Sequence, residues 1–128
     1  HIHGKDGIYA AALLVEMIAV SGKKLSEIAA DIRKEYGAIH MAERDYRFTP
    51  DEKERIHNIL MEERKLPEMP FETDHVSYMD GCKVYFKNGG WVIARFSGTE
   101  PLLRIFCEME YEPDTVRVCN LFEEYLGL

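Results

Sequence analysis

Four short runs rich in β-branched and aromatic residues constrain the fold of this chain more than any other feature. The runs cover residues 76–79, 81–87, 90–96 and 102–110. Turn residues separate them, including Asp80-Gly81 and Asn88-Gly89-Gly90. Asn-Gly between such runs is a strong β-hairpin signal, because both residues tolerate the positive φ angles of a tight turn. The sequence therefore predicts a small antiparallel sheet of about four strands.

Helical patterns flank this predicted sheet. Thr49-Pro50-Asp51-Glu52 has the form of a capping box and predicts a helix that runs to about residue 64. A last helix starts near Pro113. In the run 102–110, apolar residues alternate with residues such as Arg104, so one face of the sheet can pack against the helices. The expected fold class is α+β, a small antiparallel sheet covered by helices.

The first part of the chain follows a different pattern. Apolar residues surround most of a predicted helix at 8–19, and a second amphipathic helix is expected at 25–36. A helix this apolar needs burial on several sides, yet no strand pattern precedes it. We therefore expect this orphaned helix to pack against a second copy of the chain or to fold back on the second domain.

This contrast suggests a division of the chain. Residues 1–37 are predicted to be the helical remnant of a truncated α/β domain, and residues 49–128 a C-terminal α+β domain. Residues 38–48, of mixed polarity, are predicted to link the two, either as an extended segment or as a crossing strand.

Composition excludes several classes of function. A net charge of −7, from 16 basic and 23 acidic residues, argues against a general binder of nucleic acid or anionic membrane, which needs a basic stripe. The sequence contains neither a long apolar run nor a signal-peptide pattern, so a cytoplasmic location is expected. Cys82, Cys107 and Cys119 have no metal-binding spacing, and no metal or other cofactor is expected on this chain.

The connection between the last two runs carries the clearest chemical signal. Gly98 permits a positive φ, which would turn successive backbone N–H groups toward one point and form an anion nest. Ser97 and Thr99 add hydroxyl donors, and the guanidinium groups of Arg95 and Arg104 can reach the loop. The same residues also suit an ordinary hairpin loop. Both a phosphate site and a plain turn therefore remain open at this point, and the negative charge of the adjacent glutamate counts against the former.

The segment Arg95-Phe96-Ser97-Gly98-Thr99-Glu100-Pro101 resembles the Arg-x-Ser-Gly-Thr-Glu-Pro signature of the α-D-phosphohexomutases, the phosphoglucomutase/phosphomannomutase superfamily. The resemblance implies a last domain of the TATA-box-binding-protein-like type. It also implies that the loop grips the phosphate of a hexose phosphate through four residues and that a basic residue stands on the next strand. The residues concerned are Arg95, Ser97, Gly98 and Thr99, with Arg104 on the following strand.

The start of the chain resembles the same family. His-Ile-x-x-Lys-Asp-Gly, followed by an Ala/Leu-rich helix, is similar to the end of the family's third domain. The resemblance implies that His1 and Lys5 border the substrate cleft and that Lys5 contacts phosphate or helps a proton transfer. From the residues alone, a lysine before a capped helix is more often a solvated side chain.

The resemblance implies a parent enzyme that moves a phosphoryl group between the 1 and 6 positions of a hexose through a phosphoserine, with Mg²⁺. The phosphoserine and magnesium loops belong to the family's first two domains, and neither motif occurs here. This chain alone is therefore expected to be inactive. The sugar stays open among glucose, mannose and glucosamine. Two alternatives stand beside this reading: a separate α+β module that senses a phosphorylated metabolite, and an interaction domain without an anion site.

Overall fold

The computed structural model describes residues 4–128, and the chain divides into two compact units at the boundary between Ala38 and Ile39. His1, for which a role in the substrate cleft is expected, lies outside the described residues.

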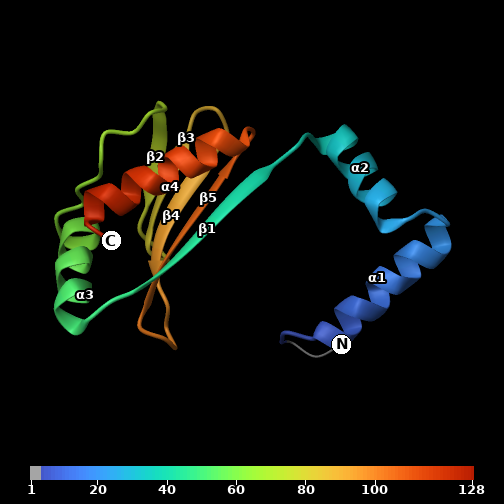
Figure 1. Cartoon of the computed structure of the whole chain (residues 1–128), viewed down its shortest axis with the longest axis horizontal. Helices are drawn as coiled ribbons and strands as arrows, with labels where there is room; N and C mark the ends of the chain where they lie inside the picture. The colour runs from blue at the N-terminus through green and yellow to red at the C-terminus, as the bar shows by residue number, and fades with distance from the viewer. Residues whose placement is uncertain (1–3) are drawn as a thin grey trace. The chain divides into compact units, whose positions relative to one another are not determined.

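The first unit consists of two helices, α1 (Gly7–Ser21) and α2 (Leu25–Tyr36), joined by a short turn (Figure 1). The side chain of Asp6 caps α1, since its Oδ1 accepts a hydrogen bond from the Tyr9 backbone N–H at 2.9 Å. At the start of α2, Glu27 Oε2 accepts from the Lys24 backbone N–H at 2.7 Å. Both helices thus begin where the sequence patterns place them.

Neither helix of this unit has a buried residue. On α1 the apolar side chains are widely exposed, with exposed fractions of 88% for Ile8 and 65% for Val15. A single neighbouring helix can cover only one side of α1. Because α1 is apolar on most of its sides, much of its apolar surface stays exposed. The unit therefore presents an apolar surface without a partner inside itself.

The second unit is an α+β domain built on a five-stranded antiparallel sheet with the strand order β1-β5-β4-β3-β2. The strands are β1 (His40–Arg47), β2 (Thr73–Ser77), β3 (Cys82–Phe86), β4 (Trp91–Phe96) and β5 (Leu102–Met109). The helices are α3 (Pro50–His57), which continues as the π-helical turn η1 (Asn58–Glu62), and α4 (Glu112–Leu126).

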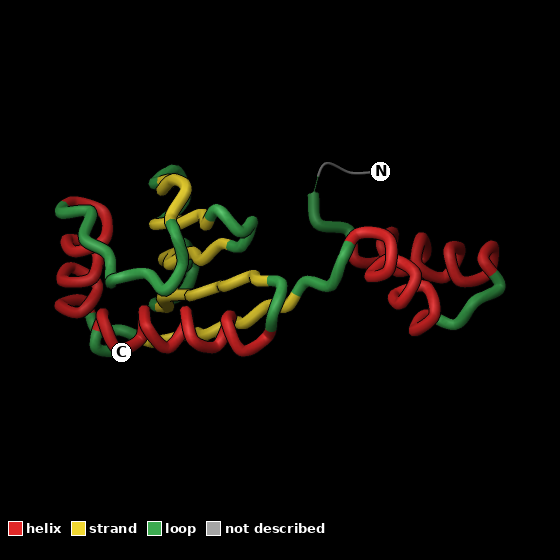
Figure 2. The backbone as a smooth tube through the Cα atoms, turned by 90° about the horizontal axis from the view of Figure 1, so that it is seen from above, coloured by secondary structure: helices red, strands yellow, loops and turns green. Residues whose placement is uncertain are grey.

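One face of the sheet forms the core of this domain. Alternate residues of β3, β4 and β5 are buried, as the apolar pattern of the last strand predicts. They pack against α3, η1 and α4, whose contributions are Ile56, Leu60, Val118 and Phe122. In Figure 2, α4 runs along the strands on this side of the sheet. The intervening residues of each strand point to the opposite face, which the helices leave open.

The predicted capping box at the start of α3 is present. Glu52 Oε2 accepts hydrogen bonds from the backbone N–H and hydroxyl of Thr49, and Thr49 Oγ1 accepts from the Glu52 N–H. The hydrogen bonds from Thr49 lower the pKa of the Glu52 carboxyl. A charged Glu52 therefore fixes the entry of the chain into α3, on the core side of the sheet.

Residues 38–48, which the sequence predicts to link the two units as an extended segment or a crossing strand, contain the strand β1. Residues 40–47 pair along their whole length with β5. The sheet consequently has five strands instead of about four. The strand is hard to see in the sequence because Ala42, opposite Cys107, is its one buried residue, and half of its eight residues are charged. Its partner strand also lies some sixty residues further along.

The helices of the described residues include none that is both long and apolar enough to cross a membrane.

We propose that the exposed apolar surface of α1 drives self-association. Burial of apolar surface is favourable by about 25 cal/mol per Å², so two copies gain by covering each other's helices. We expect analytical ultracentrifugation to show a concentration-dependent dimer, and the Ile8→Glu variant to shift it toward monomer. Glu16→Lys, on the same helix but at a polar position, serves as the control. A wild-type chain that stays monomeric at high concentration would contradict the proposal.

Candidate phosphate-binding site

Residues 97–101 connect β4 to β5 and form the loop at the lower end of the sheet in Figure 1. Two backbone hydrogen bonds close its base: Ser97 N–H donates to the Leu102 carbonyl, and Leu102 N–H donates to the Glu100 carbonyl, both at 2.8 Å. Gly98 and Thr99 are exposed at its tip. The loop is thus a short hairpin with a fixed base and an accessible tip.

The backbone of Gly98 differs from the prediction. The expected positive φ is absent, since the glycines with positive φ in the described chain are five others. A Cβ at position 98 would meet no atom within 4 Å. The missing side chain therefore leaves free space at the hairpin tip, where a ligand can approach the backbone closely.

Hydrogen-bond donors nevertheless remain available in the hairpin. The Ser97 N–H is used by the loop base, and the Thr99 N–H donates weakly to Ser97 Oγ at 3.4 Å. Among residues 4–128, the N–H groups of Gly98 and Glu100 have no hydrogen-bond partner. Two backbone donors and the hydroxyls of Ser97 and Thr99 can thus serve an anion.

Arg95 and Arg104 are direct partners in the β4–β5 ladder. Their neighbours Ala94 and Leu103 are buried in the core, so both arginine side chains lie on the open face of the sheet. Their side chains are 49% and 36% exposed. Like charges directly opposite each other in a sheet are unfavourable without compensation. The register therefore builds a positive pair next to the hairpin.

Three carboxylates compensate this pair. Asp80 Oδ2 lies 3.1 Å from Arg95 Nη1, and Asp45 Oδ1 lies 3.5 Å from Arg104 Nε. Glu100 Oε2 lies 3.3 Å from Arg104 Nη2. All three carboxylates are at least 41% exposed, so each ion pair contributes at most about 1 kcal/mol to stability.

Asp80 reaches Arg95 because of the turn between β2 and β3. Gly81 has a φ of +94°, and a Cβ there would lie 2.6 Å from the Ala94 carbonyl oxygen and 3.0 Å from the Arg95 Cα. Only glycine fits this approach of the turn to β4. The sequence predicts a turn at Asp80-Gly81 but does not indicate that this turn lies beside Arg95. The strand register, which supplies that connection, is not readable from one sequence.

Asp45 was missed for a similar reason. It faces Arg104 across the β1–β5 ladder, and β1 lay within the predicted linker.

A further cation near the base of the hairpin, Lys53 on α3, was also missed. Its Nζ lies 5.8 Å from the centre of the Phe96 ring. In the sequence, Lys53 is one of several charged residues on the exposed side of a helix, and nothing distinguishes it as a neighbour of Phe96.

The remaining predicted residues, Lys5 and the three cysteines, lie outside the hairpin. Lys5 is an exposed residue of the first unit, just before α1. Cys82, Cys107 and Cys119 are buried and free, and burial raises the pKa of Cys82 to about 11. Within the described part of the chain, no group of three or more His, Cys, Asp or Glu side chains is arranged to hold a metal ion.

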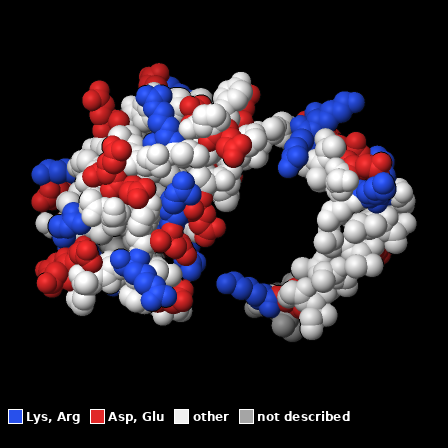
Figure 3. Space-filling model, in the orientation of Figure 1, with Lys and Arg blue, Asp and Glu red and all other residues white. Residues whose placement is uncertain are grey.

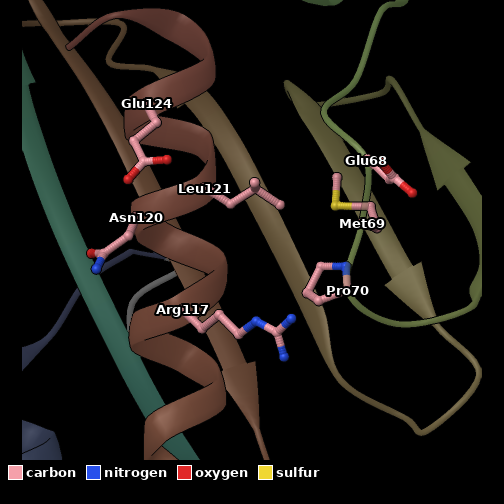
Figure 4. Close-up of a pocket in the computed structure, with 7 residues that line it drawn as sticks. All are labelled: Glu68, Met69, Pro70, Arg117, Asn120, Leu121 and Glu124. Atoms are coloured by element: carbon pink, nitrogen blue, oxygen red, sulfur yellow. The ribbon is translucent and has the colours of Figure 1, made fainter.

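A groove lies elsewhere in this domain, between α4 and the segment before β2 (Figure 4). Arg117 extends from α4 toward Pro70, and Leu121 points toward Met69. The groove is on the helical side of the sheet, whereas the arginine pair is on the open face. In the view of Figure 3, basic and acidic residues are interspersed over the domain without an extended basic patch.

An α+β domain with an Arg-x-Ser-Gly-Thr hairpin and a second arginine on the same sheet face has the features of the last domain of a phosphohexomutase. Comparison with protein-family models agrees. Residues 58–121 match "Phosphoglucomutase/phosphomannomutase, C-terminal domain", and residues 1–36 match "Phosphoglucomutase/phosphomannomutase, alpha/beta/alpha domain III". The chain belongs to the phosphoglucomutase/phosphomannomutase family and corresponds to its C-terminal part.

Curated relatives support this assignment. A phosphoglucomutase/phosphomannomutase of Thermococcus kodakarensis is 34% identical over 85% of this chain. A probable phosphoglucosamine mutase of Methanopyrus kandleri is 36% identical and a phosphoglucosamine mutase of Bacillus pumilus 30% identical, each over 96% of the chain. The chain spans 22% of the length of the first relative and 24% of each of the others.

The turn at Gly81 provides a test of this geometry. Gly81→Ala should lower the free energy of unfolding of the domain by about 1–3 kcal/mol. The new methyl group meets the β4 backbone, and the φ of this residue is strained for alanine. Chemical denaturation followed by Trp91 fluorescence measures the change. The matched control is Gly98→Ala, which has free space around its Cβ and should leave stability within about 0.5 kcal/mol of wild type. Equal stabilities for the two variants would contradict the described turn.

Proposed function

We propose that the 97–101 hairpin, together with Arg95 and Arg104, binds the phosphate group of a hexose phosphate. In this proposal the chain is the phosphate-holding part of a phosphohexomutase, an isomerase that moves a phosphoryl group between the 1 and 6 positions of the sugar. The cytoplasm, where hexose phosphates are metabolised, is the proposed location. The observation that carries the proposal is the pairing of two arginines across the strands at the base of a hairpin with unused donors.

The chemistry of these groups suits phosphate better than a neutral ligand. A guanidinium can bind two phosphate oxygens at once, and the backbone N–H groups of Gly98 and Glu100 add donors without side-chain entropy loss. Each charge-assisted hydrogen bond is worth about 1.5–3 kcal/mol. Part of this gain is offset, because the arginines already contact carboxylates in the structure. The isolated chain should therefore bind phosphate weakly.

Family membership favours the mutase over the sensor alternative. In a mutase, this domain would hold the phosphate that does not react, orient the sugar and help to exclude water from the reaction. Mg²⁺ would supply charge stabilisation in the parent enzyme, but the described residues contain no fitting ligand group. Lys5 and His1 remain proposed neighbours of the substrate.

Phosphate binding can be measured by amide NMR. Titration with inorganic phosphate or glucose 6-phosphate should shift the amide signals of Ser97, Gly98 and Thr99. Arg95→Ala should weaken the affinity about 10- to 100-fold, which corresponds to the loss of one charge-assisted contact. Arg117→Ala removes the same charge from α4, on the other side of the sheet, and should leave the affinity within twofold. An unshifted hairpin, or equal weakening by both variants, would argue against the site.

The activity of the isolated chain gives a separate test. We expect the purified 128-residue chain to show no conversion of glucose 1-phosphate to glucose 6-phosphate with or without Mg²⁺, because the sequence lacks the phosphoserine and metal motifs of the family. A coupled assay for glucose 6-phosphate measures this. If the wild-type chain converts glucose 1-phosphate and the Arg95→Ala variant does not, the expectation is wrong. The chain itself would then catalyse the reaction.

A further inference from the structure

We propose that Glu100 is an internal competitor of the bound anion: its carboxylate occupies Arg104 in the anion-free hairpin and must leave when phosphate binds. The inference rests on the proposed phosphate function and concerns the specificity of the same site. In this proposal Asp45 and Asp80 hold the arginines in position, whereas Glu100 competes with the anion for Arg104.

Two of these carboxylates belong to the fixed framework. Asp45 is the ladder partner of Arg104 on β1, and Asp80 is placed beside Arg95 by the tight turn at Gly81. Neither lies in the segment whose donors would surround an anion. Each can hold its arginine in position on the open face while the hairpin is empty or loaded.

Glu100 differs because it lies in the hairpin itself. Its backbone carbonyl is tied to the Leu102 N–H, so the main chain is fixed while the side chain can rotate. The Glu100 side chain is 56% exposed, against 41% for Asp45, and it contacts Arg104 at 3.3 Å. Because an exposed ion pair is worth at most about 1 kcal/mol, rotation of Glu100 into solvent costs little.

The local charge explains why Glu100 has to move. While its carboxylate is engaged, the two guanidinium groups face three carboxylates, and these negative charges oppose the binding of an anion. Arg104 is also incompletely satisfied, since its buried Nε makes no hydrogen bond to any described residue and only an ion pair to Asp45. A phosphate dianion carries more charge and more oxygens than Glu100, and it can contact Arg95 and Arg104 together.

The test compares two changes at the same position. Glu100→Gln removes the negative charge, whereas Glu100→Asp keeps the charge on a side chain that is one methylene shorter and so moves it away from Arg104. If Glu100 competes directly, both variants should bind inorganic phosphate about two- to fivefold more tightly than wild type, the range expected for loss of an exposed ion pair. If Glu100 acts only through its charge, Glu100→Asp should behave like wild type.

Titrations of the ¹⁵N-labelled full chain with inorganic phosphate at pH 8 measure these affinities. Glu124→Gln, an equal charge change on α4, is the control and should bind as wild type does. Tighter binding by both Glu100 variants supports the proposal. Tighter binding by Glu100→Gln alone, no change in either, or equal tightening in Glu124→Gln overturns it. A wild-type hairpin that binds no phosphate would instead overturn the proposed function, so the two failures are distinguishable.

Discussion

The site depends on one interaction, the register of β4 against β5. This register places Arg95 directly opposite Arg104 and turns both away from the core. It also fixes the length of the hairpin between them, because Ser97 and Leu102 close the base. A shift by one residue would send one arginine toward Val92 and Ile105 in the buried face, where an unpaired charge is very costly. The packing of the hydrophobic core thus indirectly determines the positions of Arg95 and Arg104 on the open face.

The positive pair has a stability cost that the domain offsets with acidic residues from three different places in the chain. A strand, a turn and the hairpin itself each contribute one carboxylate. Because these ion pairs are partly exposed, they neutralise the arginines without burying them, and the guanidinium groups remain accessible to a ligand. The stability of the empty domain and the affinity of the proposed site are therefore opposed, as is common for binding sites.

Much of the second unit could be predicted from the sequence. The strand runs, the turn at Asn88, the capping box at Thr49 and the residues of the hairpin all depend on local patterns. What could not be predicted depends on distant partners. The edge strand β1 has one buried residue, and Asp45 and Asp80 join the site only through register and turn geometry. Gly98 lacks the positive φ that its residue type permits. Local propensity carries no information about these contacts.

The position of β1 has a mechanical consequence. This strand starts two residues after the boundary between the two units, and Asp45, the sixth of its eight residues, forms an ion pair with Arg104. Any tension transmitted by the polypeptide from the helical unit would be applied to the end of a strand hydrogen-bonded along its full length to β5. Peeling would begin at His40 and advance toward the carboxylate that steadies the guanidinium. The covalent junction of the two units and the end of the sheet that carries the proposed anion site are thus joined by one eight-residue strand.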